Sequence, residues 1–119
     1  MDDVYKLRQY DRRTAVVFQT SSLMNQADVE RLKADLLRLV DGENRTRLVL
    51  DFTEVQFLSS QVIGMLLSLH KRLTAAKSAD AGAEMVLCGL RPQLIELLKV
   101  TRLDRMLKIK PTRKEAVVE

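Results

Sequence analysis

Residues 48–67 read LVLDFTEVQFLSSQVIGMLL and carry the pattern that decides the fold. The first five, Leu48–Phe52, form a short apolar run with one acid, which is typical of a central strand covered on both faces. From Ser60 to about Lys77, apolar residues recur at helical spacing and predict a helix. A buried strand that leads through a short loop into a helix is the building unit of an α/β sheet.

The predicted helix at 60–77 has an unusually wide apolar surface. Two adjacent stripes of residues make it up: Val62, Met65, Leu66, Leu69 and Leu73 in the first, and Ile63, Leu67 and His70 in the second. Together they cover about half of the circumference, more than the ~100° that a helix turns toward a core. The extra width is therefore either covered by a second element or available as a docking surface.

The segment before this unit predicts a β-hairpin. Val4–Gln9 is a strand candidate, Tyr10–Arg13 reads as a turn, and Ala15–Phe18 is a strand because β-branched and aromatic residues cluster there. Two strands joined by so short a link must be antiparallel.

A helix is predicted to follow, with Asn25 or Asp28 as its cap. Its apolar residues recur at helical spacing and give one buried face: Val29, Leu32, Leu36, Leu39 and Val40. We expect it to end within residues 41–44, where Gly42 supplies a left-handed stop.

The C-terminal part predicts one more strand and two helices. Glu84–Cys88 is a buried strand, and Pro92 suits the first turn of a helix predicted over Leu94–Val100. A short strand or turn lies within Leu103–Ile109, and residues 110–119 form a short terminal helix or tail. Because strands separated by helices pair in parallel, we predict a single α/β domain over residues 1–119. Its mixed sheet has four or five strands with a leading antiparallel hairpin, and about four helices pack mainly on one side.

The composition is that of a globular domain. Of the 119 residues, 46% are apolar and 30% are charged, and the single cysteine excludes an internal disulfide. The start, Met1–Lys6, has no signal-peptide pattern, and no apolar run approaches the ~20 residues that cross a bilayer. We expect a cytoplasmic protein without membrane insertion.

The net charge of +4 lies in the last quarter of the chain. Residues 91–119 hold eight Lys or Arg against four Asp or Glu, whereas the rest is balanced. Five aromatic residues and no Trp leave little for base stacking. A solvated basic face is therefore expected, with an acidic protein partner as the alternative, and no nucleic acid.

Chemistry-bearing motifs are absent from the sequence. One histidine, His70, and one cysteine, Cys88, cannot form the usual zinc sites, and no glycine-rich phosphate loop or GxSxG motif occurs. We expect His70 to be a half-buried packing residue and Cys88 a small core residue. No catalytic residue, metal, cofactor or nucleotide site is predicted, which leaves an interaction module.

The sequence resembles the STAS domain family (sulfate transporter and anti-sigma factor antagonist). Phe57–Leu67 is similar to the family's phosphorylation loop and following helix, which read F-I/L/M-D-S-S-G-L-G and then a hydrophobic residue with two leucines. Leu48–Phe52 resembles the preceding strand, and Gly82–Pro92 the segment G-x-x-M/L-V-L-x-x-L/V-x-P. Leu94–Leu98 with Thr101–Leu103 resembles the third helix and the S/T-x-L after it.

The resemblance implies a partner and a switch. Small free-standing members bind an anti-sigma factor of the serine-kinase type and so free a sigma factor. Phosphorylation of the second serine of D-S-S blocks that binding, because nearly two negative charges enter a loop that docks on protein. In this chain Ser59 takes the place of the aspartate, Ser60 that of the first serine and Gln61 that of the phosphoserine. Val62 replaces the next glycine, and Gly64 matches the later one.

Gln61 cannot be phosphorylated, so the resemblance implies a loop that stays in an unmodified-like state. The family's acidic residue before the first helix is also replaced, by Met24 or Asn25. Ser59 and Ser60 remain, either as a helix cap that bonds exposed amides or as out-of-register phosphorylation sites. Any ATP would belong to the partner kinase.

The partner-binding surface is expected at the start of the helix, with the loop at 21–25 beside it. Its predicted members are Leu58, Ser59, Ser60, Gln61, Val62, Met65, Ser22, Met24 and Asn25. Two functions are compatible with it. One is an anti-sigma factor antagonist that is a monomer or weak homodimer. The other is an adaptor subunit of a larger assembly, such as a stressosome-like scaffold or a lipid-transporter accessory subunit.

Overall fold

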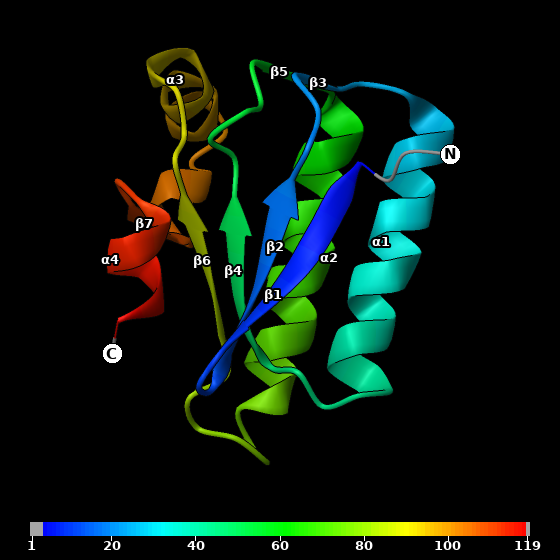
Figure 1. Ribbon diagram of the computed structural model, residues 1–119, viewed down its shortest axis with the longest axis vertical. Coiled ribbons are helices and arrows are strands. Elements are labelled where there is room, and N and C mark those ends of the chain that lie inside the picture. The colour runs from blue at the N-terminus through cyan, green and yellow to red at the C-terminus, as the bar shows by residue number, and fades with distance from the viewer. Residues whose placement is uncertain (1–3, 119) are drawn as a thin grey trace.

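In the computed structural model, which describes residues 4–118, five strands form one sheet in the order β1-β2-β4-β6-β7 (Figure 1). Their bounds are Tyr5–Tyr10 for β1, Arg13–Phe18 for β2, Arg47–Asp51 for β4, Glu84–Cys88 for β6 and Lys108–Lys110 for β7. β1 and β2 are antiparallel, and every other neighbouring pair is parallel. The predicted mixed sheet with its leading hairpin is confirmed.

Three helices connect the strands on one face of the sheet (Figure 1). Their bounds are Gln26–Asp41 for α1, Ser60–Ala76 for α2 and Pro92–Val100 for α3, which the 3-10 turn Leu103–Arg105 follows. Their apolar side chains meet alternate residues of β2, β4 and β6 in the larger core, which includes Phe18, Leu50 and Leu87. The helices lie where the sequence pattern predicts them.

A fourth helix, α4 at Arg113–Val117, covers part of the opposite face. Ala116 packs there in a smaller core with Ala15, Val49 and Val86. Burial on both faces explains why β4 and β6 read as nearly continuous apolar runs rather than alternating ones. The helices therefore lie mainly, but not entirely, on one side.

Helix α1 shows how well its pattern predicts burial. The five residues predicted to face the core are its buried ones, and the Asn25 side chain caps it by accepting a 3.1 Å hydrogen bond from the Asp28 N–H. The prediction of a left-handed Gly42 is wrong, since its φ is −91° and its N–H bonds to the Arg38 carbonyl at 2.7 Å. The chain reverses at Asn44, whose φ is 54°, because a short polar side chain tolerates that conformation.

Two further strands escape the sequence analysis. β3 at Ser22–Leu23 and β5 at Phe57–Leu58 pair in parallel as a separate two-stranded sheet. Strands of two residues carry no recognisable period, so only the tertiary structure reveals them. They connect the segment before α1 with the segment before α2.

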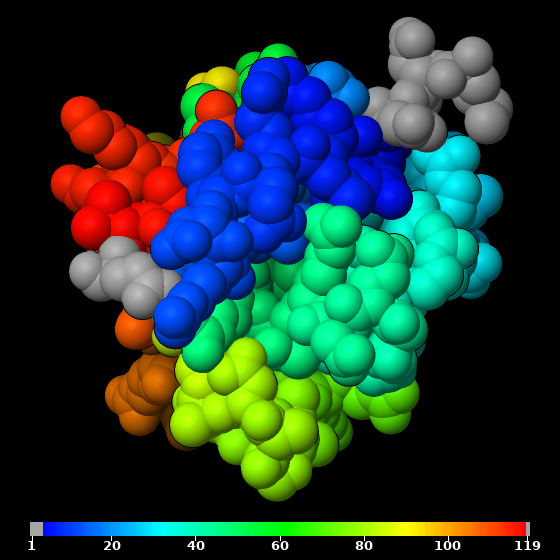
Figure 2. All heavy atoms as spheres, turned by 60° about the horizontal axis from the view of Figure 1, so that its bottom comes forward, coloured from blue at the N-terminus to red at the C-terminus, as the bar shows by residue number. Residues whose placement is uncertain are grey.

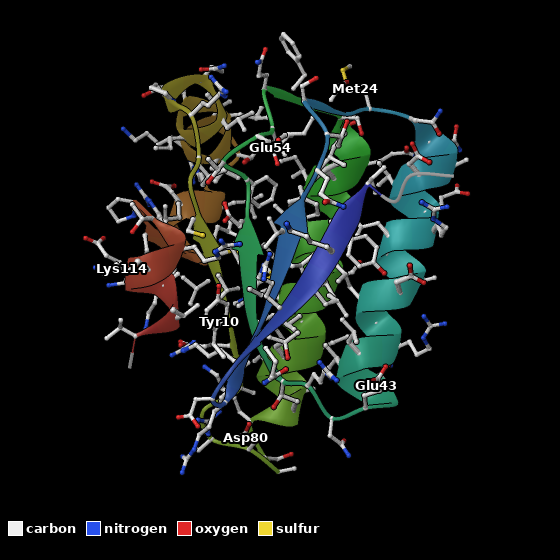
Figure 3. The ribbon with its side chains drawn as sticks, in the orientation of Figure 1. Tyr10, Met24, Glu43, Glu54, Asp80 and Lys114 are labelled. Atoms are coloured by element: carbon white, nitrogen blue, oxygen red, sulfur yellow. The ribbon has the colours of Figure 1, made fainter. Side chains whose placement is uncertain are left out.

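At the end of the molecule where β4 and β6 begin, Asp80 anchors the loop before β6 (Figure 3). Its carboxylate accepts from Arg47 Nη2 at 2.9 Å, from the Thr46 hydroxyl at 2.6 Å and from the Gly82 N–H at 3.0 Å. These hydrogen bonds, that of Arg47 first, hold the pKa of Asp80 well below its usual range. The β1–β2 hairpin and the segment after α1 meet at this same end (Figure 2).

Glu84, at the start of β6, joins cations from two other strands. Its carboxylate lies 2.8 Å from Arg13 Nη2 and 3.3 Å from Lys108 Nζ. The Arg13 side chain is only 11% exposed, and its Nε and Nη1 have no hydrogen-bond partner among the described residues. Burial raises the pKa of Glu84, but the two cations together outweigh it, so the net pKa lies below the ordinary value.

Replacing Glu84 with glutamine is expected to lower the free energy of unfolding at pH 7 by about 1–2 kcal/mol, because a nearly buried guanidinium loses its counter-charge. A carboxylate whose pKa is lower in the folded than in the unfolded protein stabilises the fold at every pH above its unfolded-state pKa. This contribution is lost as the pH falls through the folded-state pKa. The difference in the free energy of unfolding between wild type and Glu84→Gln should therefore become smaller as the pH drops below about 4. Urea unfolding across this pH range measures the difference, and Glu96→Gln, at an exposed position, is the control. A difference that does not depend on pH would refute the ionic pairing of Glu84 with Arg13 and Lys108.

Candidate functional site

The loop at 21–25 and the segment at 57–61 lie against each other, as the sequence analysis predicts. Parallel pairing of β3 with β5 sets Ser22 opposite Phe57 and Leu23 opposite Leu58. The Ser59 N–H continues the pairing with a 3.0 Å hydrogen bond to the Leu23 carbonyl. Both segments lie beside the start of α2, at one end of the molecule (Figure 1).

Two large apolar side chains are exposed at this end. Met24, directly after β3 (Figure 3), is 56% exposed, and Phe57, in β5, is 55% exposed. The remaining predicted members differ in exposure: Ser22, Asn25, Ser60 and Gln61 are exposed, and Leu58 and Ser59 are half-buried. We call these eight residues, with Phe57 included, the β3–β5 surface.

Charge is nearly absent from this surface. Glu54 is the one Asp, Glu, Lys or Arg between Asp51 and Lys71, and it is exposed in the loop before β5 (Figure 3). Exposed apolar side chains surrounded by neutral polar groups are typical of a surface that contacts protein.

Two predicted members do not belong to the surface. Val62 is fully buried and Met65 is 1% exposed, because the first stripe of α2 faces the sheet and forms part of the larger core. In the second stripe, Ile63 and Leu67 pack against the same core yet stay partly exposed, and His70 is half-buried as expected. The extra width of the apolar surface of α2 is therefore partly covered by the larger core.

The start of α2 departs from the predicted cap. Ser59 occupies the cap position with φ −92° and ψ 168°, but its side chain makes no capping hydrogen bond. Its Oγ is buried without a hydrogen-bond partner among the described residues. The next hydroxyl, on Ser60, is in the first turn and exposed, and that turn holds no acidic residue. The positive end of the helix dipole thus stays uncompensated beside Gln61.

Phe57 is the functional candidate that the sequence analysis does not select. It appears there only within the motif, and the predicted partner-binding surface begins at the next residue, Leu58. The alternation in β5, with Phe57 exposed and Leu58 half-buried, is the available signal, and it spans only two residues.

The described residues offer neither a metal-binding cluster nor a reactive thiol. Within residues 4–118, no three His, Cys, Asp or Glu side chains are grouped to hold a metal ion, and no helix is long and apolar enough to cross a membrane. Cys88 is fully buried at the end of β6. Burial, aided by the Asp51 carboxylate and opposed by Arg113, raises the pKa of its thiol to about 12, so it is not a nucleophile at neutral pH.

The chain is similar to members of a known protein family. The family model described as STAS domain matches residues 6–116. The BtrV protein of Bordetella bronchiseptica, named as a candidate anti-sigma factor antagonist, is 32% identical over 79 residues, which span 66% of this chain and 63% of BtrV.

Solved structures share the fold over nearly the whole chain. An anti-sigma factor antagonist (STAS) domain protein from Planctomyces limnophilus has a TM-score of 0.80 at 24% identity and covers 95% of this chain and 93% of its own. An anti-sigma factor antagonist from Mycobacterium paratuberculosis has a TM-score of 0.78 at 18% identity, with 95% and 89% covered. With the family model matched from the first strand to α4, the chain belongs to the STAS domain family.

Proposed function

We propose that this chain is an anti-sigma factor antagonist that binds an anti-sigma factor of the serine-kinase type through the β3–β5 surface. The observation that carries the proposal is the presence of two exposed apolar side chains, Met24 directly after β3 and Phe57 in β5, on paired segments beside the first turn of α2. Membership of the STAS family and the likeness to BtrV support the class of partner. We infer that the chain acts by binding rather than catalysis, as one cytoplasmic domain.

The surface suits docking because it is already ordered. Backbone hydrogen bonds from the Gln56, Phe57 and Ser59 N–H groups tie the segment before α2 to the segment before α1. A preformed apolar patch loses little conformational entropy on binding, so more of the contact energy appears as affinity. Aromatic residues at the centre of such patches commonly contribute most of that energy.

Gln61 makes this binding independent of phosphate at the family's acceptor position. Its side chain is exposed in the first turn of α2, where a phosphoserine would bring nearly two negative charges onto a surface that otherwise has almost none. Glutamine presents a neutral amide of similar reach and has no hydroxyl to modify. The antagonist is therefore proposed to stay in its binding state while its kinase partner is active.

Introducing Gln61→Ser is expected to create a phosphorylation site. After incubation with the cognate kinase and Mg-ATP, phosphopeptide mapping should find phosphate at position 61 of the variant and none on wild type. Gln61→Ala is the matched control, since it shortens the side chain equally without adding a hydroxyl. Only position 61 is changed in this test. Rebuilding the whole family loop would also replace Val62 and Ser59, and because Val62 and the Ser59 Oγ are buried, those changes would disturb the core.

The outcome that contradicts this prediction is phosphate on wild type. Ser60 is exposed one residue before Gln61, and a helix N-terminus tolerates a phosphate electrostatically. Stoichiometric phosphate on Ser60 in wild type or in Gln61→Ala would mean that the switch survives in a shifted register.

The partner itself is tested by affinity capture from the source cells, followed by mass spectrometry. Wild type should retain an anti-sigma factor with a kinase domain, and Phe57→Asp should not. Retention of transporter components or of stressosome-like scaffold subunits instead would overturn the proposal in favour of the adaptor function.

A further inference from the structure

A cavity of about 690 Å³ lies on the α4 face of the sheet, at the carboxyl ends of β4 and β6. The loops that follow these strands contribute to its lining, together with α4, the segment before α4 and the end of β1. Ligands of open α/β sheets commonly bind at the carboxyl ends of the strands, and this volume is in the usual range for small-molecule sites. Neither the β3–β5 surface nor the proposed partner involves this cavity.

Its charged lining is unbalanced. Arg91, Arg113 and Lys114 contribute three cations, and Asp51 contributes the one carboxylate. Asp51 is 5% exposed, and its carboxylate already accepts hydrogen bonds within the protein. Its Oδ1 accepts one from the Thr53 N–H at 3.0 Å and one from the Thr53 hydroxyl at 2.5 Å. Its Oδ2 lies 3.6 Å from Arg113 Nη1. The carboxylate thus compensates Arg113.

Arg91 and Lys114 are left without an anionic partner among residues 4–118. They come from different elements around the cavity, Arg91 from the residue before α3 and Lys114 from α4. Two uncompensated cations beside one cavity are complementary to a ligand with about two negative charges.

The loops around the cavity are held rigidly. Gly89 has a φ of +69°, and a Cβ there would lie 2.3 Å from Thr53 Oγ1 and 3.0 Å from Asp51 Oδ1. Only glycine lets the two loops approach this closely. The Gly89 N–H also bonds to the Pro111 carbonyl at 3.2 Å, which ties the loop after β6 to the segment before α4. The cavity is therefore formed before any ligand arrives.

Apolar side chains complete the lining. Tyr10, at the end of β1, and Val117, on α4, also line the cavity. A ligand here meets positive charge at one part and an aromatic or aliphatic surface at another.

We propose that this cavity binds a small molecule that carries a phosphate monoester on an apolar or aromatic body. The phosphate, with nearly two negative charges at neutral pH, is held by Arg91 and Lys114. A guanidinium matches phosphate oxygens with paired hydrogen bonds, and an ammonium adds a compact charge. Tyr10 and Val117 contact the body of the ligand. The sequence analysis, which predicts no nucleotide site, does not anticipate this cavity.

The test titrates the ¹⁵N-labelled full chain with phenyl phosphate and follows the amide resonances. Saturable shifts are expected at Gly89, Arg91 and residues 112–114, whereas phenol, which lacks the phosphate, should leave them in place. Lys114→Glu should weaken binding by about tenfold or more, because it removes one phosphate contact and adds a repulsive charge. Arg91→Gln should weaken it similarly and keeps the test independent of α4.

The matched control is Lys33→Glu, which makes the same change of charge at an exposed position of α1. It should bind phenyl phosphate like wild type. Equal weakening by Lys33→Glu, equal shifts with phenol, or shifts scattered away from the cavity would each overturn the proposal. Because none of these variants alters the β3–β5 surface, the result does not depend on the partner proposed above.

Discussion

Phe57→Asp is expected to weaken binding of the anti-sigma factor kinase by about 30-fold or more. The ring is 55% exposed on a surface with almost no charge, so a partner that covers it must exclude water from it. An aspartate in its place removes the apolar contact and carries an unpaired charge into the interface. Titration calorimetry with the purified kinase measures the loss.

The matched control for this variant is Val118→Asp. Val118 is also an exposed apolar residue, 64% accessible, but it follows α4, away from β3 and β5 (Figure 1). Its replacement should leave the affinity unchanged. If Phe57→Asp stays folded and binds as well as wild type, or if Val118→Asp weakens binding equally, the partner docks elsewhere.

Phe52→Ala is expected to lower the free energy of unfolding by about 3–5 kcal/mol. Phe52 directly follows β4, is fully buried, and its ring centroid lies 4.8 Å from that of Phe18 with the planes tilted by 51°. The substitution leaves a cavity between the sheet and its helices and removes a favourable aromatic pair. Urea denaturation reports the change.

Phe57→Ala provides the comparison, because it makes the same chemical change five residues later at an exposed position. Its effect on stability should stay within about 0.5 kcal/mol. Equal losses for the two variants would mean that the division between core residue and surface residue is wrong.

The regular part of the fold follows from sequence periodicity. In α1 the predicted face of five residues matches the buried one, since sixteen residues repeat the helical period several times. The strands β4 and β6 are recognisable because burial on both faces makes every position apolar. β3 and β5 are not, since two-residue strands form only where the backbones at Ser21–Leu23 and Gln56–Ser59 meet.

The site is predictable only in part. The resemblance predicts a partner-binding surface at the start of α2, but two of its predicted members, Val62 and Met65, are buried. A sequence pattern gives the width of an apolar stripe but not its direction relative to the sheet. The predicted surface therefore contains both exposed residues and core residues. The cavity on the α4 face has no local signature, because its lining extends from Tyr10 to Val117.

Independence from phosphate is tested by the affinity of the wild-type protein for its anti-sigma factor kinase, measured before and after incubation of the pair with Mg-ATP. We expect the same dissociation constant in both states, because Gln61 offers no hydroxyl to the kinase, while Gln61→Ser should lose affinity once ATP is added. A fall in wild-type affinity after ATP, accompanied by phosphate on Ser59 or Ser60, would contradict it.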